Sequence, residues 1–457
     1  MLTREYIKEL AESDKQSLVG LVENTKDSSS LIFVLENLGY LSKDFDGEFL
    51  LDLLGHKNPN VRTLAVKNIG KIKGHNYIED IKRVALEDSN TSVRREAVSS
   101  IGRVRDEDNI NFLVDMLDDF DPKIVCQAIR ALLVFRGNYY VDSNLQGLIN
   151  HDNEMVRSVI RKEYFSCEDV VKRQAHSESH NYLKNVVVHG DTLEVMNLLK
   201  DDTVHLTFTS PPYYNARDYS IYPSYQYYLD FLTRVFREVY RITKEGRFLI
   251  LNTSPVIVPR ISRAHSSKRY PIPFDIHHYL MEIGWEFIDD IIWLKPEASV
   301  KNRVGGFMQH RKPIGYKPNC VTEYLMVYRK KTEKLLDWNI KQYDSDVVNN
   351  SRVNEEFETT NVWKIDPCYD KVHSAVFPQE LCRRVIKYYS YIGDLVFDPF
   401  AGSGTVGRVA KNLGRRFFLT EKDVEYFDYM KTKKVDDTMF DERPTKFLTV
   451  DEFKVNI

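Results

Sequence analysis

The sequence predicts two domains of different fold class, an all-α solenoid followed by a doubly wound α/β domain. Three observations lead to this prediction. Residues 47–165 repeat with a period near 32 residues. From Val186 onward, apolar strand-like runs alternate with helix-like segments. One of these runs, Leu395-Val396-Phe397, leads directly into a glycine-rich loop. At 457 residues the chain is long enough for more than one core.

The repeat is marked by matching apolar positions that each follow a short polar turn. They are Val61, Val93, Ile124 and Met155, separated by 32, 31 and 31 residues. After each turn, apolar residues recur at helical spacing. We expect Asn58 and Asp121 to be helix N-caps, with Pro59 and Pro122 at the first helical position. A fixed period of this size indicates stacked repeats that bury their apolar faces against one another.

The pattern VRxxAVxxIG stands in the first two repeats, from Val61 and from Val93, and resembles that of short HEAT-like repeats. Residues 1–165 are therefore predicted to form an α-solenoid, with residues 1–46 as its helical cap. Its helices are rich in arginine and lysine. At equivalent repeat positions such residues either form structural ladders or contribute to a recognition surface, and the sequence leaves both readings open.

The second half begins after a predicted connector, residues 166–184. Strands are expected at residues 186–188, 204–208, 248–251, 291–294, 324–328, 395–397 and 417–419, with a helix at 192–199. Alternation of strands and helices predicts a doubly wound, Rossmann-like sheet, in which ligands bind at the carboxyl ends of the strands.

Two loops at such strand ends carry the chemistry. Thr209-Ser210-Pro211-Pro212-Tyr213 follows one strand, and the run DPFAGSGT, residues 398–405, follows another. Glycines let the backbone turn tightly and approach a ligand, and the absence of a following lysine excludes a phosphate loop of the GxxxxGK type. Asp398 and Glu421 place carboxylates at two strand ends, suited to an ammonium group and to ribose hydroxyls.

Together these loops resemble those of the β-class DNA amino-methyltransferases. The resemblance covers residues 186 to about 430 and includes the HSAVFP run at residues 373–378. It implies S-adenosylmethionine as cofactor and a circularly permuted fold in which the catalytic loop precedes the cofactor loop. The expected parts are a catalytic half (185–330), a short target-recognition segment (331–372), a cofactor half (373–430) and a tail (431–457).

The resemblance also implies roles for individual residues. The Ser210 hydroxyl and the Pro211 carbonyl would accept hydrogen bonds from the target amine, whose lone pair is otherwise delocalised into the base. Pro212 stiffens the loop, and Tyr213 offers a face to an extruded base. The cofactor would be held by Asp191, Phe377, Pro378, Asp398, Phe400, Gly402, Gly404, Thr405 and Glu421. Asp191 could equally be the N-cap of helix 192–199.

Double-stranded DNA is the partner that the resemblance implies. Two loop-like stretches of the catalytic half are rich in cations, and their net charge would suit phosphates. We expect DNA contacts from Arg260, Arg263, Lys268, Arg269, Lys301, Arg303, Arg311 and Lys312. Solvated surface loops are the alternative explanation.

Serine at position 210, directly before the two prolines, favours cytosine N4 as the methylated atom, because Asp or Asn at this position is typical of adenine-N6 enzymes. Methylation of adenine N6 is the first alternative. The second is a solenoid interaction protein with an inactive methyltransferase half. An enzyme of this kind would belong to a bacterial restriction-modification system with a cognate endonuclease, and would act as a monomer or homodimer.

Composition limits the remaining possibilities. The net charge of −3 means that DNA would be held by local basic surface. The five cysteines are never spaced as CxxC, so the sequence predicts no metal site and a reducing, cytoplasmic environment. No apolar stretch is long enough for a membrane span.

Overall fold

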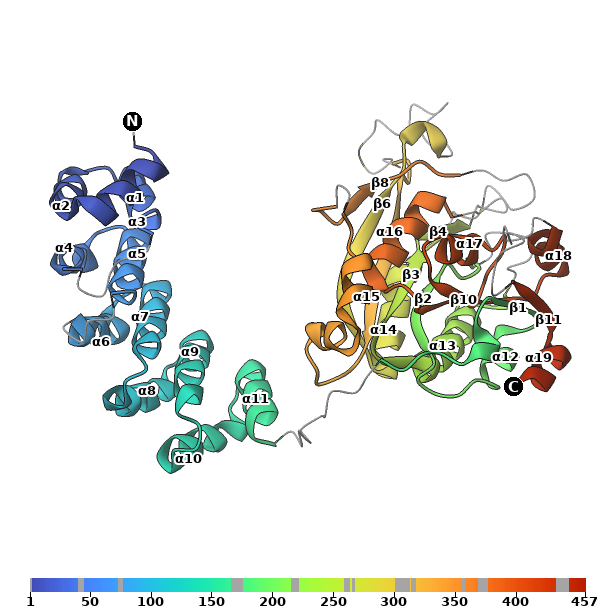
Figure 1. The fold of residues 1–457 in the computed structure, drawn as a ribbon, viewed down its shortest axis with the longest axis horizontal. Coiled ribbons are helices and arrows are strands. Elements are labelled where there is room, and N and C mark those ends of the chain that lie inside the picture. The colour runs from blue at the N-terminus through green and yellow to red at the C-terminus, as the bar shows by residue number, and fades with distance from the viewer. Residues whose placement is uncertain are drawn as a thin grey trace. The chain divides into compact units, whose positions relative to one another are not determined.

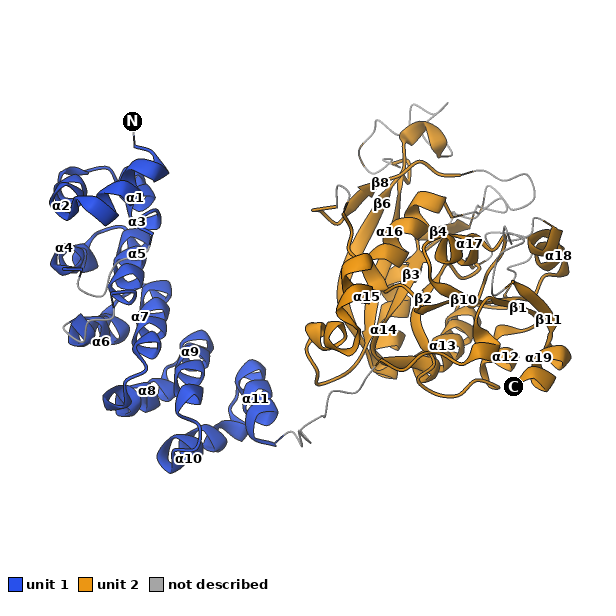
Figure 2. Ribbon diagram, in the orientation of Figure 1, with its two compact units in different colours: residues 1–170 blue, residues 171–457 orange. Residues whose placement is uncertain are grey.

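The computed structural model describes most of the chain. The described residues are 2–39, 45–72, 77–165, 176–214, 222–258, 264, 268–300, 313, 318–354, 358–368, 377–432 and 444–457. The chain divides into two compact units, unit 1 (residues 1–170) and unit 2 (residues 171–457), which Figure 2 shows in different colours. None of the described helices is long and apolar enough to cross a membrane.

Unit 1 is built of helices (Figure 1), which confirms the solenoid prediction. Its α-helices are α1 (Arg4–Ser13), α2 (Lys15–Asn24), α3 (Ser28–Glu36), α4 (Glu48–Leu51), α5 (Pro59–Ile69), α6 (Ile78–Glu87), α7 (Thr91–Val104), α8 (Ile110–Asp115), α9 (Pro122–Leu132), α10 (Tyr139–Gly147) and α11 (Glu154–Ile160). The predicted caps are present. Asn58 accepts the N–H of Asn60 at 2.9 Å, and Asp121 accepts the N–H of Lys123 at 2.8 Å.

The fourth repeat lies one residue later than predicted. Its N-cap is Asn153, which accepts the N–H of Met155 at 3.0 Å. Three residues after each N-cap stand Val61, Val93, Ile124 and Val156, and all four side chains are fully buried. Met155, the residue expected there, is 55% exposed. Asp152 and Asn153 are both good caps, and only the packing of the helix selects between them.

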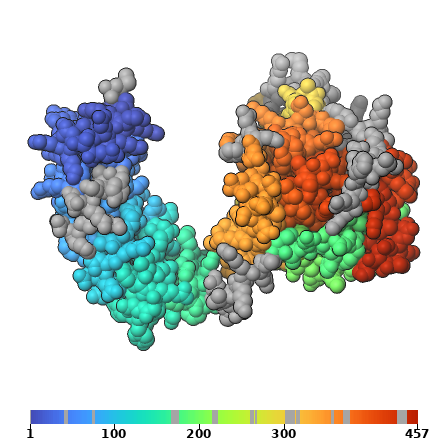
Figure 3. Space-filling model, in the orientation of Figure 1, coloured from blue at the N-terminus to red at the C-terminus, as the bar shows by residue number. Residues whose placement is uncertain are grey.

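The helices of unit 1 form two rows. α5, α7, α9 and α11 pack one on the next and form the inner row of a curved array, whereas α6, α8 and α10 form the outer row (Figure 1). The space-filling view shows the successive colours of the chain following one another along unit 1 (Figure 3). This is the arrangement expected when each repeat contacts its neighbours.

Unit 2 contains a nine-stranded sheet in the order β11-β1-β10-β9-β2-β3-β7-β6-β8. Its strands are β1 (Val186–His189), β2 (Val204–Thr209), β3 (Thr243–Thr253), β6 (Trp285–Leu294), β7 (Thr322–Lys330), β8 (Val362–Lys364), β9 (Leu395–Asp398), β10 (Arg416–Glu421) and β11 (Lys446–Thr449). β7 runs antiparallel to both of its neighbours, and all other neighbours in the sheet are parallel. A hairpin of β4 (Val256–Val258) and β5 (Lys268–Tyr270) lies outside this sheet.

Helices cover both faces of the sheet, so unit 2 is a three-layer α/β domain. The helices that pack on one face are α12 (Thr192–Met196), α13 (Tyr225–Ile242), α14 (Ile272–Ile283) and α19 (Val450–Asn456). Those that pack on the other face are α16 (Gln379–Tyr389), α17 (Thr405–Asn412) and α18 (Val424–Thr432). Successive strand residues alternate between the two cores: Leu249 and Leu251 belong to one core, and Ile250 to the other. The short helix α15 (Ser345–Asn350) has no buried residue.

The topology predicts where a ligand binds. From β9 the chain crosses through α17 to β10, on one side of β9 in the sheet. From β2 it crosses through α13 to β3, in the opposite direction. β2 and β9 are neighbours, with Thr207 opposite Phe397. The carboxyl ends of these two strands therefore form the topological switch point, where open α/β sheets bind their ligands.

Unit 2 begins earlier than predicted, because part of the expected connector packs on it. The backbone N–H of His176 donates to the carbonyl of Gln342 at 3.0 Å, and the Ser179 hydroxyl donates to the carbonyl of Thr203 at 2.7 Å. Leu183 is fully buried. Single buried residues in a non-repetitive stretch carry no periodic signal, which is why the sequence did not assign residues 176–184 to unit 2.

Candidate active site

The strands at the switch point are joined by a hydrogen bond between side chains. The Thr209 hydroxyl donates to Asp398 Oδ1 at 2.7 Å, and the backbone N–H of Phe400 donates to the same oxygen at 3.0 Å. Asp398 is 2% exposed, and this burial raises the pKa of its carboxyl to about 7. The TSPPY loop and the glycine loop are therefore tied together where each begins.

The glycine loop requires glycine at two positions. Gly402 and Gly404 have φ of 53° and 75°, in the left-handed region that side chains rarely adopt. A Cβ on Gly404 would also lie 2.7 Å from the sulfur of Met430. The backbone N–H of Gly402 donates to Glu421 Oε2 at 2.7 Å, which ties the loop to the end of β10. Burial raises the pKa of Glu421.

The other residues predicted to hold the cofactor lie near these strand ends. Thr405 is buried in the first turn of α17. Phe377 stacks on Phe208 of β2 with ring centroids 4.7 Å apart, and Pro378 precedes α16. Asp191 accepts the N–H of Leu193 at 3.0 Å, so its N-cap role is present. A contact between Asp191 and the cofactor stays a prediction.

Ser210 and Tyr213 share a hydrogen-bond network with residues of β3 and β7. The amide nitrogen of Asn252 lies 3.3 Å from Ser210 Oγ and from the Tyr213 hydroxyl, and donates to Glu323 Oε2 at 2.7 Å. Tyr213 also donates to Glu323 Oε2, at 3.2 Å. Burial and the Glu323 carboxylate raise the pKa of Tyr213 well above its usual value, so the phenol stays protonated and can donate.

Sequence reasoning missed Asn252 and Glu323 as site residues. Asn252 directly follows a predicted strand at the ligand-binding edge, and that position was a usable signal. Glu323 stands near the start of β7, which reaches the same edge only because β7 is antiparallel to β3. Lys295 forms an ion pair with Glu323 and lies 4.4 Å from the centre of the Trp293 ring.

The structure places two of the eight residues predicted to bind DNA. Lys268 and Arg269 lie on β5, pair with Val258 and Ile257 of β4, and are exposed. Arg260, Arg263, Lys301, Arg303, Arg311 and Lys312 lie outside the described residues, as do the first four residues of the HSAVFP run. Exposure on a two-stranded ribbon suits a phosphate contact, and the DNA contacts stay predictions.

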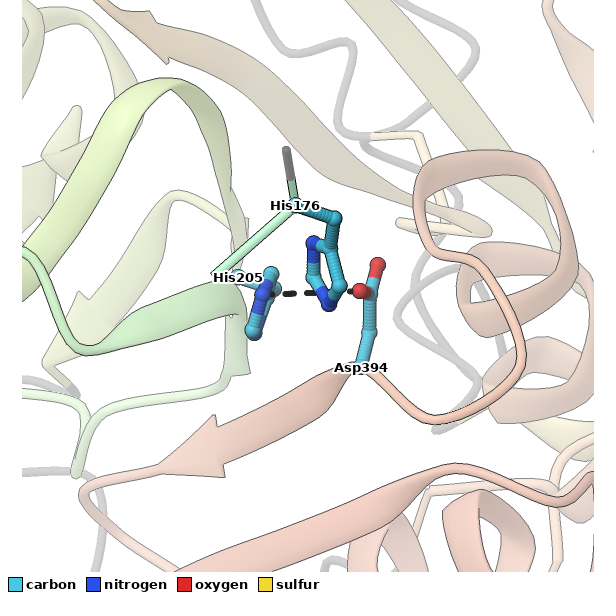
Figure 4. A group of neighbouring side chains, drawn as sticks. All are labelled: His176, His205 and Asp394. Carbon is cyan, nitrogen blue, oxygen red and sulfur yellow. Dashed lines mark ion pairs between the residues drawn. The ribbon is translucent and has the colours of Figure 1, made fainter. Parts of the chain in front are cut away.

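One group among the described residues, His176, His205 and Asp394, has metal-ligating side chains close together (Figure 4). It lies at the amino ends of β2 and β9, opposite to the switch point. The backbone N–H of Leu395 donates to His205 Nδ1 at 3.1 Å, so neutral His205 carries its proton on Nε2. His205 Nε2 lies 3.6 Å from Asp394 Oδ1 and has no hydrogen-bond partner among the described residues.

Asp394 has other partners as well. The Tyr343 hydroxyl donates to it at 2.5 Å, the N–H of Tyr391 at 2.8 Å, and the Arg247 guanidinium lies 3.4 Å away. Burial lowers the pKa of His205 well below its usual value, which keeps the ring neutral. The hollow beside this group, about 400 Å³ in volume, is lined by cations and carboxylates together. Neither sign of charge dominates it, so it indicates no ligand class.

The fold and the switch point define a doubly wound α/β protein in which a glycine loop is joined to a Ser-Pro-Pro-Tyr loop. A family model described as DNA methylase matches residues 204–432, half of the chain, and the chain belongs to this N6/N4 family. A model for HEAT repeats matches residues 47–133 of unit 1. Enzymes of the N6/N4 family use S-adenosylmethionine as methyl donor.

Several curated proteins are similar to this chain. The Type II β methyltransferase M.BslI of Bacillus sp. (strain NEB-606) is 26% identical over 286 residues, covering 59% of this chain and 30% of that protein. The Type II methyltransferase M.Cfr9I of Citrobacter freundii is 30% identical over 273 residues, covering 52% of this chain and 84% of that protein. The chain thus spans less than a third of M.BslI. Among solved structures, PvuII DNA methyltransferase (cytosine-N4-specific) is 17% identical, with a TM-score of 0.43, covering 61% of this chain and 97% of that one.

Proposed function

We propose that this protein is a DNA methyltransferase that transfers a methyl group from S-adenosylmethionine to the exocyclic amino nitrogen of a flipped base. The observation that carries the proposal is the hydrogen bond between Thr209 and Asp398. It joins the loop suited to an amine to the loop suited to the methyl donor, at the place where a doubly wound sheet binds ligands. Methyl transfer needs the amino nitrogen of the base in line with the methyl group of the donor.

The donor set at the switch point fits S-adenosylmethionine. Asp398 and Glu421 are largely buried carboxyls, and neither has an ion-pair partner among the described residues. Both accept hydrogen bonds from neutral groups of the chain: Asp398 from Thr209 and Phe400, and Glu421 from the backbone of Gly402 and Asp423. A buried carboxylate also needs a cation to offset its desolvation. The ammonium group of the cofactor would supply one, and the ribose hydroxyls would add further donors. When bound, the cofactor contributes a methyl group made electrophilic by the adjoining sulfonium.

Further residues would enclose the cofactor. Gly402 and Gly404 allow the backbone to approach it closely, and Phe400 and Thr405 belong to the same loop. Phe377 and Pro378 would contribute from the start of α16, and Asp191 from the end of β1. In this arrangement the catalytic half, residues 185–330, precedes the cofactor half, residues 373–430. That is the permuted order of the β class.

The chain's own residues would activate the amine by accepting its hydrogens. Ser210 Oγ and the Pro211 carbonyl would each accept one amino hydrogen, so that the nitrogen lone pair turns toward the methyl group. Asn252 donates to Ser210 Oγ, which directs the serine proton toward the Tyr213 oxygen, 3.5 Å away. Tyr213 in turn donates to Glu323. We therefore infer that Glu323 and Asn252 are positioning residues for the TSPPY loop.

DNA would be held by surface cations while the base is extruded. A base inside a duplex cannot reach the switch point, so flipping is required. Tyr213 would stack on the extruded base, and Lys268 and Arg269 of the β4–β5 hairpin would contact phosphates. The remaining predicted contacts from residues 260–263 and 301–312 would extend this surface.

We further propose cytosine N4 as the methylated atom, in a restriction-modification system with a cognate endonuclease. Serine at position 210 supports this choice over adenine N6. The deciding experiment incubates the full chain with labelled S-adenosylmethionine and mixed-sequence duplex DNA, then identifies the methylated nucleoside by mass spectrometry. N4-methyldeoxycytidine is expected. N6-methyldeoxyadenosine would assign the enzyme to adenine instead. Calorimetric binding of the cofactor without any transfer would favour the inactive-methyltransferase alternative.

A further inference from the structure

The two helix rows of unit 1 carry opposite charge. The inner row, α5, α7, α9 and α11, contains the cations Arg62, Lys67, Arg94, Arg95, Arg103, Lys123, Arg130 and Arg157, and the acids Glu96 and Glu154. The outer row, α6, α8, α10 and the 3-10 turns that flank α8, contains the cations Lys82 and Arg83. Its acids are Glu79, Asp80, Glu87, Glu107, Asp108, Asp115, Asp118 and Asp142. A protein with a net charge of −3 has therefore gathered cations on one side of its repeat array.

Three of the inner-row arginines are structural. Arg62 forms a two-pronged ion pair with Asp88, at 2.7 and 2.8 Å, and Arg94 pairs with Asp119 at 3.1 Å. These acids precede the N-caps of the following repeats. Arg157 donates to the backbone carbonyls of its own turn. A structural ladder, one of the two explanations that the sequence left open, thus exists at this repeat position. Arg62 and Arg94 connect neighbouring repeats, whereas Arg157 holds its own turn.

Six other cations lie on the solvent-exposed face of the inner row. They are Lys67 and Lys71 of the α5 repeat, Arg95 and Arg103 of α7, and Lys123 and Arg130 of α9, and all six are exposed. We name them the basic ridge. Counted from the N-caps Asn58, Asn90 and Asp121, they stand 2, 5, 9 or 13 positions along. At 3.6 residues per turn, the five of these residues that lie within α5, α7 and α9 fall on one helix face, and Lys71 follows two residues after the end of α5.

Neighbouring repeats bring the ridge cations together. The Arg103 guanidinium lies 3.1 Å from where a Cβ on Gly70 would stand, next to Lys71. The pKa of Lys71 is lowered by burial and then by the positive charges of Lys67 and Arg103, as closely placed cations require. Glu96 is the acid on this face of α5, α7 and α9, and it pairs with Arg103 at 2.8 Å. The ridge keeps a clear excess of positive charge.

We propose that the basic ridge binds the phosphate backbone of the same DNA duplex that unit 2 methylates. The inference rests on the proposed function of unit 2. Helices pack about 8–10 Å apart, so three inner helices span roughly 20 Å, along which duplex DNA presents about 12 negative charges. Between the cations, outward positions are mostly polar, among them Asn60, Thr63, Ser92, Ser99 and Gln127. Protein interfaces are instead depleted of lysine and enriched in aromatic residues.

The binding would be independent of sequence. Lysines and exposed arginines on a curved helical face meet phosphates, whereas base edges are reached from within a groove. Unit 1 would therefore add affinity and unit 2 would select the base. This division predicts that loss of the ridge weakens DNA binding without changing which base is methylated.

The test compares two full-length variants with the same change in net charge. In the ridge variant the six ridge residues become glutamine, which keeps helix propensity. In the control variant six exposed cations of unit 1 outside the ridge become glutamine: Arg4, Lys8, Lys15, Lys26, Lys57 and Arg83. Circular dichroism and calorimetric binding of S-adenosylmethionine check that both variants fold. Fluorescence anisotropy then measures Kd for a labelled 60-base-pair duplex and a labelled 15-base-pair duplex at several salt concentrations.

We expect the ridge variant to lose at least tenfold in affinity for the long duplex at low salt. The slope of log K against log salt should fall by about 0.9 for each phosphate that the variant no longer neutralises. The control variant should keep the wild-type slope. Equal Kd and slope in the two variants would overturn the inference. Methylation of duplex DNA with labelled S-adenosylmethionine is measured for wild type in parallel. If wild type binds and methylates DNA, such a result counts against the ridge alone; if wild type does neither, the proposed function of unit 2 fails.

Discussion

The two ends of the neighbouring strands β2 and β9 bury charged groups in contrasting ways. At the amino ends, Asp394 is fully buried and meets a guanidinium, a phenol and a backbone N–H. At the carboxyl ends, Asp398 is buried almost as deeply but receives only neutral donors, from Thr209 and Phe400. Burial raises the pKa of Asp398 to about 7.

The difference separates a structural network from a ligand site. A buried carboxylate that serves stability needs its countercharge within the protein. A buried carboxylate that binds a ligand receives its countercharge from the ligand. Without the ligand, the protein bears the cost of desolvating that carboxylate. Asp394, at the amino end, has the Arg247 guanidinium as its countercharge and accepts hydrogen bonds from Tyr343 and Tyr391. Asp398 and Glu421 lack a cation among the described residues, and they stand at the edge where ligands bind.

The largest effect is expected at the amino end. Asp394→Asn would leave the buried Arg247 charge without a carboxylate, since Arg247 is 3% exposed. Breaking a buried ion pair in this way typically costs about 3–5 kcal/mol. Urea denaturation of unit 2 in the full chain measures the loss, and Glu238→Gln, in a more exposed pair with Arg241, is the matched control. A change below about 1 kcal/mol would mean that the network at the amino end is not structural.

At the carboxyl end, Ser210→Ala should impair transfer while leaving the fold intact. Removing one hydrogen-bonding group that acts on the reacting centre typically costs about 10²–10³ in kcat. Single-turnover methylation measures the rate, and calorimetry measures cofactor affinity, which should stay close to that of wild type. Tyr213→Ala should behave alike because the base loses its stacking face. Loss of cofactor binding in both variants would show that the loop belongs to the cofactor site.

The raised pKa of Asp398 predicts a pH dependence of stability. A carboxyl that holds its proton more tightly when folded stabilises the protein at low pH. That contribution is lost as pH rises from the unfolded value near 4 to about 7. Asp398→Asn removes this contribution. Denaturation at pH 5 and pH 8 should therefore show that the free energy of unfolding falls less with rising pH in the variant than in wild type. A parallel pH dependence in the two proteins would mean that Asp398 is ionised in the apo state.

The smallest effect is expected for the network behind the TSPPY loop. Glu323→Gln keeps the shape of the side chain but removes the carboxylate that receives the Tyr213 proton and pairs with Lys295. Because Glu323 acts through other residues, we expect roughly a tenfold loss in kcat, the size of one hydrogen bond to a charged group. KM for the cofactor should not change. A Glu323→Gln enzyme with wild-type kcat would remove Glu323 from the positioning residues.

Local patterns predicted much of the fold and of the site. The 31–32-residue period indicated the solenoid, and the N-caps Asn58 and Asp121 stand where capping chemistry placed them. The strands that end at Thr209, Asp398 and Glu421 were each found from a short apolar run followed by a polar turn. Local signals failed where two neighbouring residues had equal propensity. Asp152 and Asn153 are the example, and burial of Val156 decided the register.

The sequence by itself determined the two fold classes, the family and the two loops at the switch point, because period, strand runs and glycine positions are properties of consecutive residues. Only the tertiary structure joined Thr209 to Asp398, and only the antiparallel course of β7 brought Glu323 to Tyr213. It also separated the arginines of the inner row that have structural partners from the exposed cations of the basic ridge. These interactions join residues far apart along the chain. Their geometry depends on packing that no single segment encodes.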